Sequence, residues 1–215
     1  MIRILILQWF KWQAASAAQK VLISQYNFKE IQEILDGYWQ RYLQFKKEVP
    51  KMPTLGGAIM VHLAAMSRGF YVEVTARGQN EKVATQLFYD IAWQVYKKMG
   101  KFSWWIAKGG NRSGYDRVLK ATQLFRFFPF NSPSYHWEEV QTDYSMVGFN
   151  CTKCPVADYF KAHKLSSFCS NTWCALDFPL AQLWNSELER TGSIAEGFDK
   201  CDFRWKVNDA DLKKK

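Results

Sequence analysis

All five cysteines of this 215-residue chain lie between residues 151 and 204. Cysteines that serve only as small buried hydrophobic residues should be scattered over the apolar positions of a chain, yet the first 150 residues contain none. Asp177, Arg190 and Asp202 lie among them, so this segment combines thiols, carboxyl groups and a cation. We therefore expect any chemistry of the protein to be located there. The cysteines are Cys151, Cys154, Cys169, Cys174 and Cys201.

Four short motifs in this segment have the order and spacing of a known family. They are Cys154-Pro155 before an aromatic helix, the Cys-x-x-Asp-aromatic-Pro run 174–179, the Arg-Thr-x-x-Ile-x-x-Gly run 190–197, and the Cys-Asp-Phe-Arg run 201–204. The chain thus resembles the L-2-amino-thiazoline-4-carboxylic acid hydrolase family, specifically over residues 140–206 and more weakly over 54–99. Cys151 and Cys169 are not part of the family pattern.

The resemblance implies a hydrolase that opens a small heterocycle of sulfur or nitrogen. The type reaction converts the cyclic amidine 2-aminothiazoline-4-carboxylate to N-carbamoylcysteine. The other expected substrate class is a related amidine or amide, in which a C–N bond is cleaved. Such chemistry needs a nucleophile, a proton donor and a cation for the carboxylate. Cys154 is the preferred nucleophile, because Cys-Pro places it at a helix N-terminus that lowers a thiol pKa, and Lys153 should act in the same direction. A half-buried structural cysteine is the competing interpretation.

Asp177 and Asp202 are the candidate acid and base. Both have apolar neighbours in the sequence, and burial among them would raise the pKa of a carboxyl group. Arg190 is assigned to the substrate carboxylate, and Arg204 and His136 are further candidates for substrate binding. Helix caps, turns or surface salt bridges would explain the same residues without a functional role.

The same thiols also suit a metal. Cys154, Cys174 and Cys201, with Asp177 as a fourth ligand, would form a set that zinc prefers. C-x2-C followed by C-x4-C is not a familiar zinc-finger spacing, and the hydrolase chemistry requires no cofactor. Zinc therefore belongs to an alternative function, a non-catalytic small-molecule-binding or sensor domain with an aromatic pocket and a structural cysteine-rich zinc site.

Composition limits the other classes of function. Aromatic residues make up 17% of the chain, which predicts an aromatic core and pocket. The odd cysteine number and the size of the chain favour free thiols in a reducing compartment, and hence the cytoplasm. The net charge of +9 is spread along the chain. Residues 101–126 combine basic and aromatic residues in the manner of a single-strand nucleic-acid groove, but a solvated face with its aromatic residues turned inward explains them better, so nucleic acid is not the expected partner.

The N-terminal residues imitate a signal peptide. Their apolar core is short, and Lys11 and Gln13 interrupt it before the small residues that follow, which argues against secretion. No stretch reaches the roughly 18 apolar residues of a membrane-spanning helix. Peripheral membrane contact through residues 1–12, with Trp9 and Trp12 beside Lys11, is a minor alternative.

Hydrophobic periodicity predicts helices, a loop at 108–114, and strands. A helix over 27–47 is followed by an antiparallel pair, in which Thr54 caps the first helix and Asn80 the second, with Gly100 at its end. Strands are expected at 135–142, 144–150, 188–191 and 200–207, and further helices at 155–163 and 176–184.

These elements indicate an α+β fold with N-terminal helices packed on an antiparallel sheet of four or five strands. The family also has a distant, fold-level similarity to the ligand-binding domains of the 4-vinyl reductase type. Residues 1–50 are expected to form a helical extension, 51–207 the α+β domain and 208–215 a polar tail.

Overall fold

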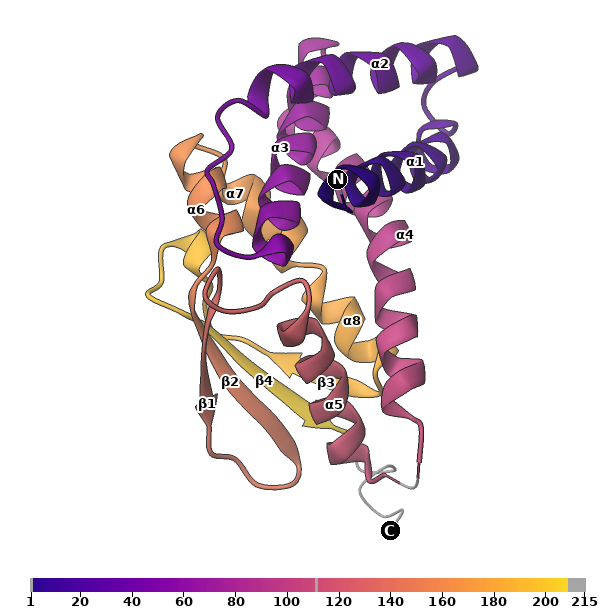
Figure 1. The fold of residues 1–215 in the computed structure, drawn as a ribbon. Helices are drawn as coiled ribbons and strands as arrows, with labels where there is room; N and C mark the ends of the chain where they lie inside the picture. Colours follow the sequence, from indigo (N-terminus) through magenta and orange to yellow (C-terminus); the bar gives the residue numbers. More distant parts are fainter. Residues whose placement is uncertain (1, 111, 209–215) are drawn as a thin grey trace.

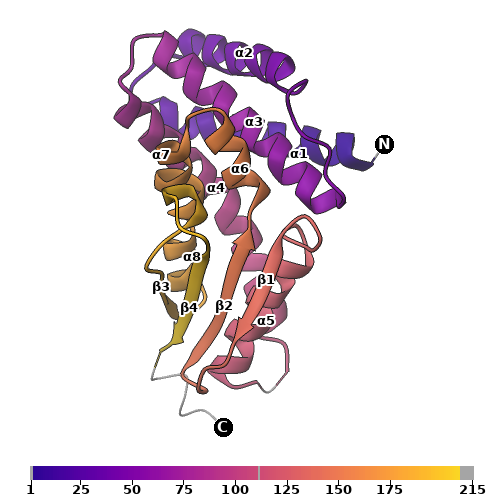
Figure 2. The same ribbon diagram turned by 90° about the vertical axis from the view of Figure 1, so that its left-hand side faces the viewer.

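An antiparallel sheet of four strands forms one layer of the protein (Figure 1), and helices cover one of its faces (Figure 2). The structure is a computed structural model that describes residues 2–110 and 112–208. The strand order is β1-β2-β4-β3. The α+β class and the four-stranded antiparallel sheet are therefore confirmed. The strands are β1 (His136–Val140), β2 (Met146–Lys153), β3 (Ser186–Glu189) and β4 (Cys201–Val207).

Strand alternation decides which side chains of the last strand face the helices. Cys201, Phe203 and Trp205 are buried, whereas the residues between them are half-buried. Cys151 of β2 is paired with Cys201 and Phe149 with Phe203. Directly opposed residues share a face of a sheet, so two cysteines and an aromatic cluster line the covered face.

Two long helices, α3 (Leu55–Ala76) and α4 (Glu81–Ala107), form the centre of the helical layer. The predicted caps are confirmed: the Thr54 side chain accepts from the Gly57 N–H, and that of Asn80 from the Val83 N–H. The predicted end of the second helix at Gly100 is wrong, because α4 continues for two further turns. A Cβ at Gly100 would lie 2.4 Å from Leu180 Cδ1. This glycine makes room for a crossing helix instead of ending its own.

The first 50 residues form α1 (Ile2–Leu22) and α2 (Phe28–Phe45), which lie against α3 and α4 (Figure 1). The predicted helix α2 is confirmed, and it begins with a capping box of Asn27 and Glu30. Leu22 and Ile34 belong to the same buried cluster as the α3 residues. No described helix is long and apolar enough to cross a membrane.

Short helices complete the covered face of the sheet. The helices α6 (Pro155–Ala162) and α8 (Asp177–Leu183) occur where the sequence predicted them. Hydrophobic periodicity predicted no separate helix at α1, which lies in the expected helical extension, or at α5 (Gly114–Phe127). Of the predicted tail 208–215, only residue 208 is described and the rest lies outside the described residues. The short elements are α5 (Gly114–Phe127), α6 (Pro155–Ala162), α7 (Ser166–Cys169), a π-helix (Ser170–Cys174), α8 (Asp177–Leu183) and a 3₁₀ turn (Ile194–Glu196).

Candidate functional site

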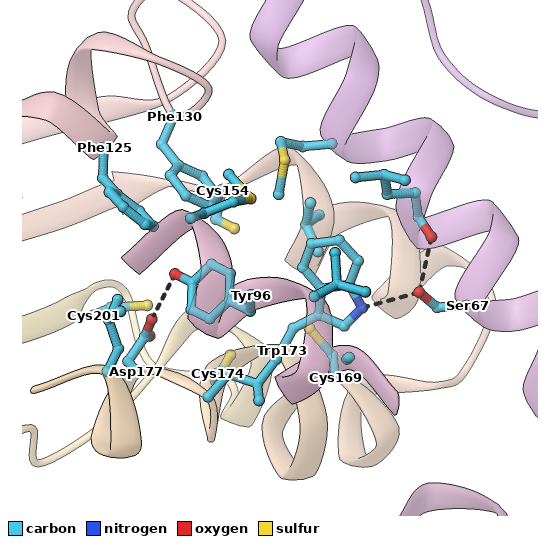
Figure 3. A pocket seen from close by; sticks show the side chains of 18 of the residues that line it. Ser67, Tyr96, Phe125, Phe130, Cys154, Cys169, Trp173, Cys174, Asp177 and Cys201 are labelled. Atoms are coloured by element: carbon cyan, nitrogen blue, oxygen red, sulfur yellow. Dashed lines mark hydrogen bonds between the residues drawn. The ribbon is translucent and has the colours of Figure 1, made fainter. Parts of the chain in front are cut away.

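A cavity of about 240 Å³ lies between the covered face of the sheet and the helices. Its walls are mostly apolar and aromatic, as the composition predicts. Figure 3 shows the polar groups that enter it, among them the side chains of Tyr96, Cys174 and Asp177. All five cysteines and one ion pair thus share a single concave space with aromatic walls. The cysteines that line it are Cys151, Cys154, Cys169, Cys174 and Cys201, of which Cys151 is held in the sheet by a bond to a backbone carbonyl.

An ion pair joins the first turn of α8 to the segment after β3. Arg190 Nη1 donates to Asp177 Oδ2 at 3.0 Å, and Nη2 donates to the Cys174 carbonyl at 3.0 Å. The Tyr96 hydroxyl of α4 donates to the other carboxylate oxygen at 3.4 Å. Burial raises the pKa of Asp177 to about 6 although Arg190 lowers it. This carboxyl group can therefore exchange a proton near neutral pH.

Cys174 is the thiol whose environment favours the thiolate. It ends the π-helix that begins one residue after Cys169. Hydrogen bonding from Cys169 lowers the pKa of Cys174, and the nearby Arg190 charge lowers it further, so that together they outweigh burial. The same hydrogen bond, together with burial, raises the pKa of Cys169. Of the two thiols, Cys174 is therefore the more acidic, and Cys169 is the one that keeps its proton.

Cys154 lies where the sequence predicted it, at the N-cap of α6, but its electrostatics differ from the prediction. Burial raises the pKa of its thiol well above the ordinary value, and a backbone hydrogen bond from Ala157 does not compensate. Lys153 does not help, because its ammonium group is directed toward the Pro133 carbonyl. The expectation of a lowered pKa at Cys154 is thus wrong, since desolvation outweighs the helix dipole.

The other two thiols that line the cavity are also protonated. Burial raises the pKa of Cys201 to about 12, and its sulfur accepts a hydrogen bond from the Ile194 N–H at 3.3 Å. Burial likewise raises the pKa of Cys151, whose thiol donates to the Lys153 carbonyl. These two cysteines therefore behave as part of the packed wall.

With this geometry in view, comparison with known proteins places the chain. Residues 60–205, more than half of the sequence, match the family described as L-2-amino-thiazoline-4-carboxylic acid hydrolase. The chain belongs to this family. No curated protein matches it. Among solved structures it is similar to the Fe(II) unliganded H-NOX protein from K. algicida, with 6% identity, a TM-score of 0.43, and coverage of 91% of this chain and 95% of that one.

Three predicted site residues of this family member lie away from the cavity. Asp202 and Arg204 are on the opposite face of β4 from Cys201, because side chains alternate along a strand. Burial raises the pKa of Asp202, but hydrogen bonds from Thr191 and Gly192 outweigh it and lower the pKa below the ordinary value. The prediction that burial raises this pKa overall is therefore wrong.

Arg204 and His136 have structural surroundings of their own. Arg204 donates to the Phe149 carbonyl at 3.2 Å and to Asn150 Oδ1 at 3.1 Å. The His136 side chain is 61% exposed on the edge strand β1. The structure thus brings together Cys154, Asp177 and Arg190 of the predicted residues, and it separates them from the other three.

Cys154, Cys174 and Cys201 of the alternative zinc set all line the cavity. Over residues 2–110 and 112–208, however, no group of three or more His, Cys, Asp or Glu side chains is arranged to hold a metal ion. A zinc site needs its ligands within bonding distance of one point.

Sequence reasoning missed several polar groups of the cavity. Tyr96 belongs to the buried face of a long helix, where periodicity alone does not separate a pocket residue from a core residue. Tyr38, Tyr135 and Trp205 also line the cavity. The two hydroxyls and the indole N–H are buried and have no hydrogen-bond partner within the described part of the chain, which is unusual for buried polar groups.

Proposed function

We propose that this protein hydrolyses a small cyclic amidine in the cavity, with Cys174 as nucleophile. The observation that carries the proposal is a thiol with a lowered pKa beside an ion pair whose carboxyl group has a pKa of about 6. Family membership supports the reaction class. The size of the cavity agrees as well: an apolar cavity of about 150 Å³ holds benzene, so about 240 Å³ accommodates a carboxylated five-membered ring.

The product dictates which bond of 2-aminothiazoline-4-carboxylate breaks. N-carbamoylcysteine keeps both nitrogens on the former amidine carbon, so that carbon loses its ring sulfur. The Cys174 thiolate attacks this carbon, the carbon–sulfur bond breaks, and the leaving sulfur takes the proton of the Asp177 carboxyl group. The substrate is then bound to Cys174 as an S-linked isothiourea.

Water completes the reaction. Ionised Asp177 removes a proton from a water molecule, which adds to the same carbon and expels the Cys174 thiolate. The urea group of the product forms, Asp177 is again protonated, and one water has been consumed. Arg190 uses two of its N–H groups for Asp177 and the Cys174 carbonyl. Its remaining N–H groups are suited to the substrate carboxylate.

Product formation tests this proposal directly. Purified, reduced protein is incubated with 2-aminothiazoline-4-carboxylate, and N-carbamoylcysteine is measured by mass spectrometry. We expect turnover by the wild type and by Cys154→Ser, and none by Cys174→Ser of equal thermal stability. Turnover that Cys154→Ser abolishes and Cys174→Ser retains would transfer the nucleophile to Cys154. No product from a folded wild type would reject this substrate.

A second function, small-molecule binding without turnover, is favoured by a different observation. Tyr38, Tyr135 and Trp205 line a cavity with mostly apolar walls, and their buried polar atoms lack hydrogen-bond partners within the described residues. Such a cavity with a few polar groups is typical of a ligand-binding pocket. Calorimetric binding of the thiazoline with no product would support this alternative. Zinc in the purified protein, measured by elemental analysis and lost with Cys174→Ser, would support its structural zinc site.

A further inference from the structure

The pair Cys169 and Cys174 has a geometry that the other cysteines lack. The two are five residues apart, a spacing that in an α-helix places side chains on different faces. The π-helix Ser170–Cys174 instead closes i→i+5 hydrogen bonds, which brings residues five apart onto the same side. The two thiols accordingly interact, and this interaction raises the pKa of Cys169 and lowers that of Cys174. Figure 3 shows both in one part of the cavity wall.

The two thiols differ in chemical state and in access. Cys169 is 1% exposed and its thiol stays protonated, whereas Cys174 is half-buried and faces the cavity. An oxidant small enough to enter the cavity therefore meets Cys174 first. A thiol with a lowered pKa that faces a cavity, beside a second, protonated thiol on the same side of the π-helix, is the arrangement of a reactive cysteine with a resolving cysteine.

We propose that Cys174 and Cys169 form a reversible disulfide on reaction with hydrogen peroxide. The Cys174 sulfur attacks one peroxide oxygen, the O–O bond breaks, and a sulfenic acid and hydroxide result. The Cys169 sulfur then attacks the Cys174 sulfur, the S–S bond forms and the S–O bond breaks. The two thiol protons leave with the two hydroxides as water. Peroxide takes up the two electrons that the thiols lose.

The disulfide has a consequence for activity that rests on the proposed function. Oxidised Cys174 has no thiolate, so the hydrolase reaction stops until a dithiol reductant restores it. Cys169 protects Cys174 in this process, because a disulfide is reversible whereas the higher sulfur acids are not.

The sequence allows this disulfide to be located without ambiguity. Trypsin leaves Cys169 and Cys174 together in the peptide 165–190, and it separates the other cysteines into the peptides 127–153, 154–161 and 201–204. The reduced protein is treated with hydrogen peroxide, then alkylated and digested without reductant. We expect peptide 165–190 to lose two hydrogens and to resist alkylation, and dithiothreitol to reverse both changes.

Matched variants separate the steps. Cys169→Ser should give no disulfide and should accumulate a sulfenic acid at Cys174 that dimedone traps, whereas Cys154→Ser should behave as the wild type does. Full alkylation of peptide 165–190 in peroxide-treated, folded protein, or a disulfide that involves another peptide, would overturn the inference. The disulfide is detected by mass and does not depend on turnover. If the disulfide forms in a protein that shows no hydrolysis, the proposed function is rejected and the disulfide inference stands.

Discussion

Arg190 Nη1 lies 3.0 Å from Asp177 Oδ2 on the wall of the cavity, and the two side chains are only 6% and 18% exposed. Removing two charges from water is costly even when they are paired. This desolvation cost applies to the Asp177–Arg190 ion pair, which lies next to Cys174. Carboxyl groups whose pKa is shifted toward neutrality are found more often at functional sites than elsewhere in proteins.

Stability should depend on the protonation of Asp177. Its pKa in the folded protein is about 6, above the ordinary 3.8, so the folded state binds the proton more tightly than the unfolded state. The stabilisation that comes from this proton is fully present at a pH below the ordinary pKa of 3.8, and it is lost as the pH rises through about 6. One pKa unit corresponds to about 1.4 kcal/mol. We expect Asp177→Asn to remove this dependence, which amounts to about 3 kcal/mol, in urea unfolding curves measured across that range.

Turnover should follow the same titration. Because protonated Asp177 supplies the proton to the leaving sulfur, kcat should fall as the pH rises above about 6. Asp177→Asn should lower kcat by a factor of about 10² to 10⁴ and abolish this pH dependence. Asp202→Asn is the matched control, since that carboxylate lies on the other face of β4. An unchanged pH profile in Asp177→Asn would exclude it as the proton donor.

Alkylation rates should reveal the state of Cys174. Its pKa is lowered by the Cys169 hydrogen bond and by Arg190, so iodoacetamide should modify peptide 165–190 faster than the peptide that contains Cys154. Arg190→Gln should raise the pH midpoint of this reaction, because it removes a nearby opposite charge. Arg204→Gln, on the far side of the sheet, should leave it unchanged. A midpoint that both variants shift equally would contradict the assigned electrostatics.

The carboxylate of Glu73 should stabilise the contact between α2 and α3. The side chain is 9% exposed, and Arg41 Nε and Arg77 Nε each donate to it at 2.7 Å. These hydrogen bonds lower its pKa in spite of burial, so its stabilisation is present above the ordinary carboxyl pKa and is lost as the pH falls through the lowered value. Glu73→Gln should lower the free energy of unfolding by about 2 kcal/mol at neutral pH.

Glu33→Gln is the control for that prediction. Glu33 binds the same Arg77 at 3.3 Å but is 48% exposed, so its loss should cost less than about 0.5 kcal/mol. Equal effects of the two variants in urea unfolding, or a Glu73→Gln effect that persists in acid far below the ordinary carboxyl pKa, would show that the carboxylate charge at Glu73 is not what holds the helices together.

Part of the site could be predicted from the sequence because the residues lie close together in the chain. The run from Cys174 to Arg190 bridges one helix and one strand, and motif spacing identified both ends. Strand alternation could also have separated Cys201 from Asp202, since neighbours on a strand cannot face the same cavity. The π-helix was beyond such reasoning, because its i→i+5 pairing departs from the α-helical period on which the sequence patterns depend. Desolvation of Cys154 depends on packing that only the tertiary structure defines.

Gly100 illustrates the same limit at the level of the fold. A glycine after two lysines is a typical helix end, yet α4 continues because α8 packs against it there. Helix α1 was missed for a related reason. Its apolar residues surround the axis, so no amphipathic period marks it.

The exposed apolar side chains of α1 lead to a prediction. Ile2, Leu5, Trp9 and Trp12 recur at the spacing of one helix face and are exposed, Trp12 by 66%. Every charged residue before Glu30 is basic. Exposed Trp and aliphatic side chains beside basic residues are suited to an anionic lipid surface. We expect the protein to sediment with phosphatidylserine-containing vesicles and to be released by salt. Binding should decrease in Trp9→Ser/Trp12→Ser but not in Trp105→Ser, which removes a similarly exposed indole from α4; equal binding by all three proteins would place the lipid contact elsewhere.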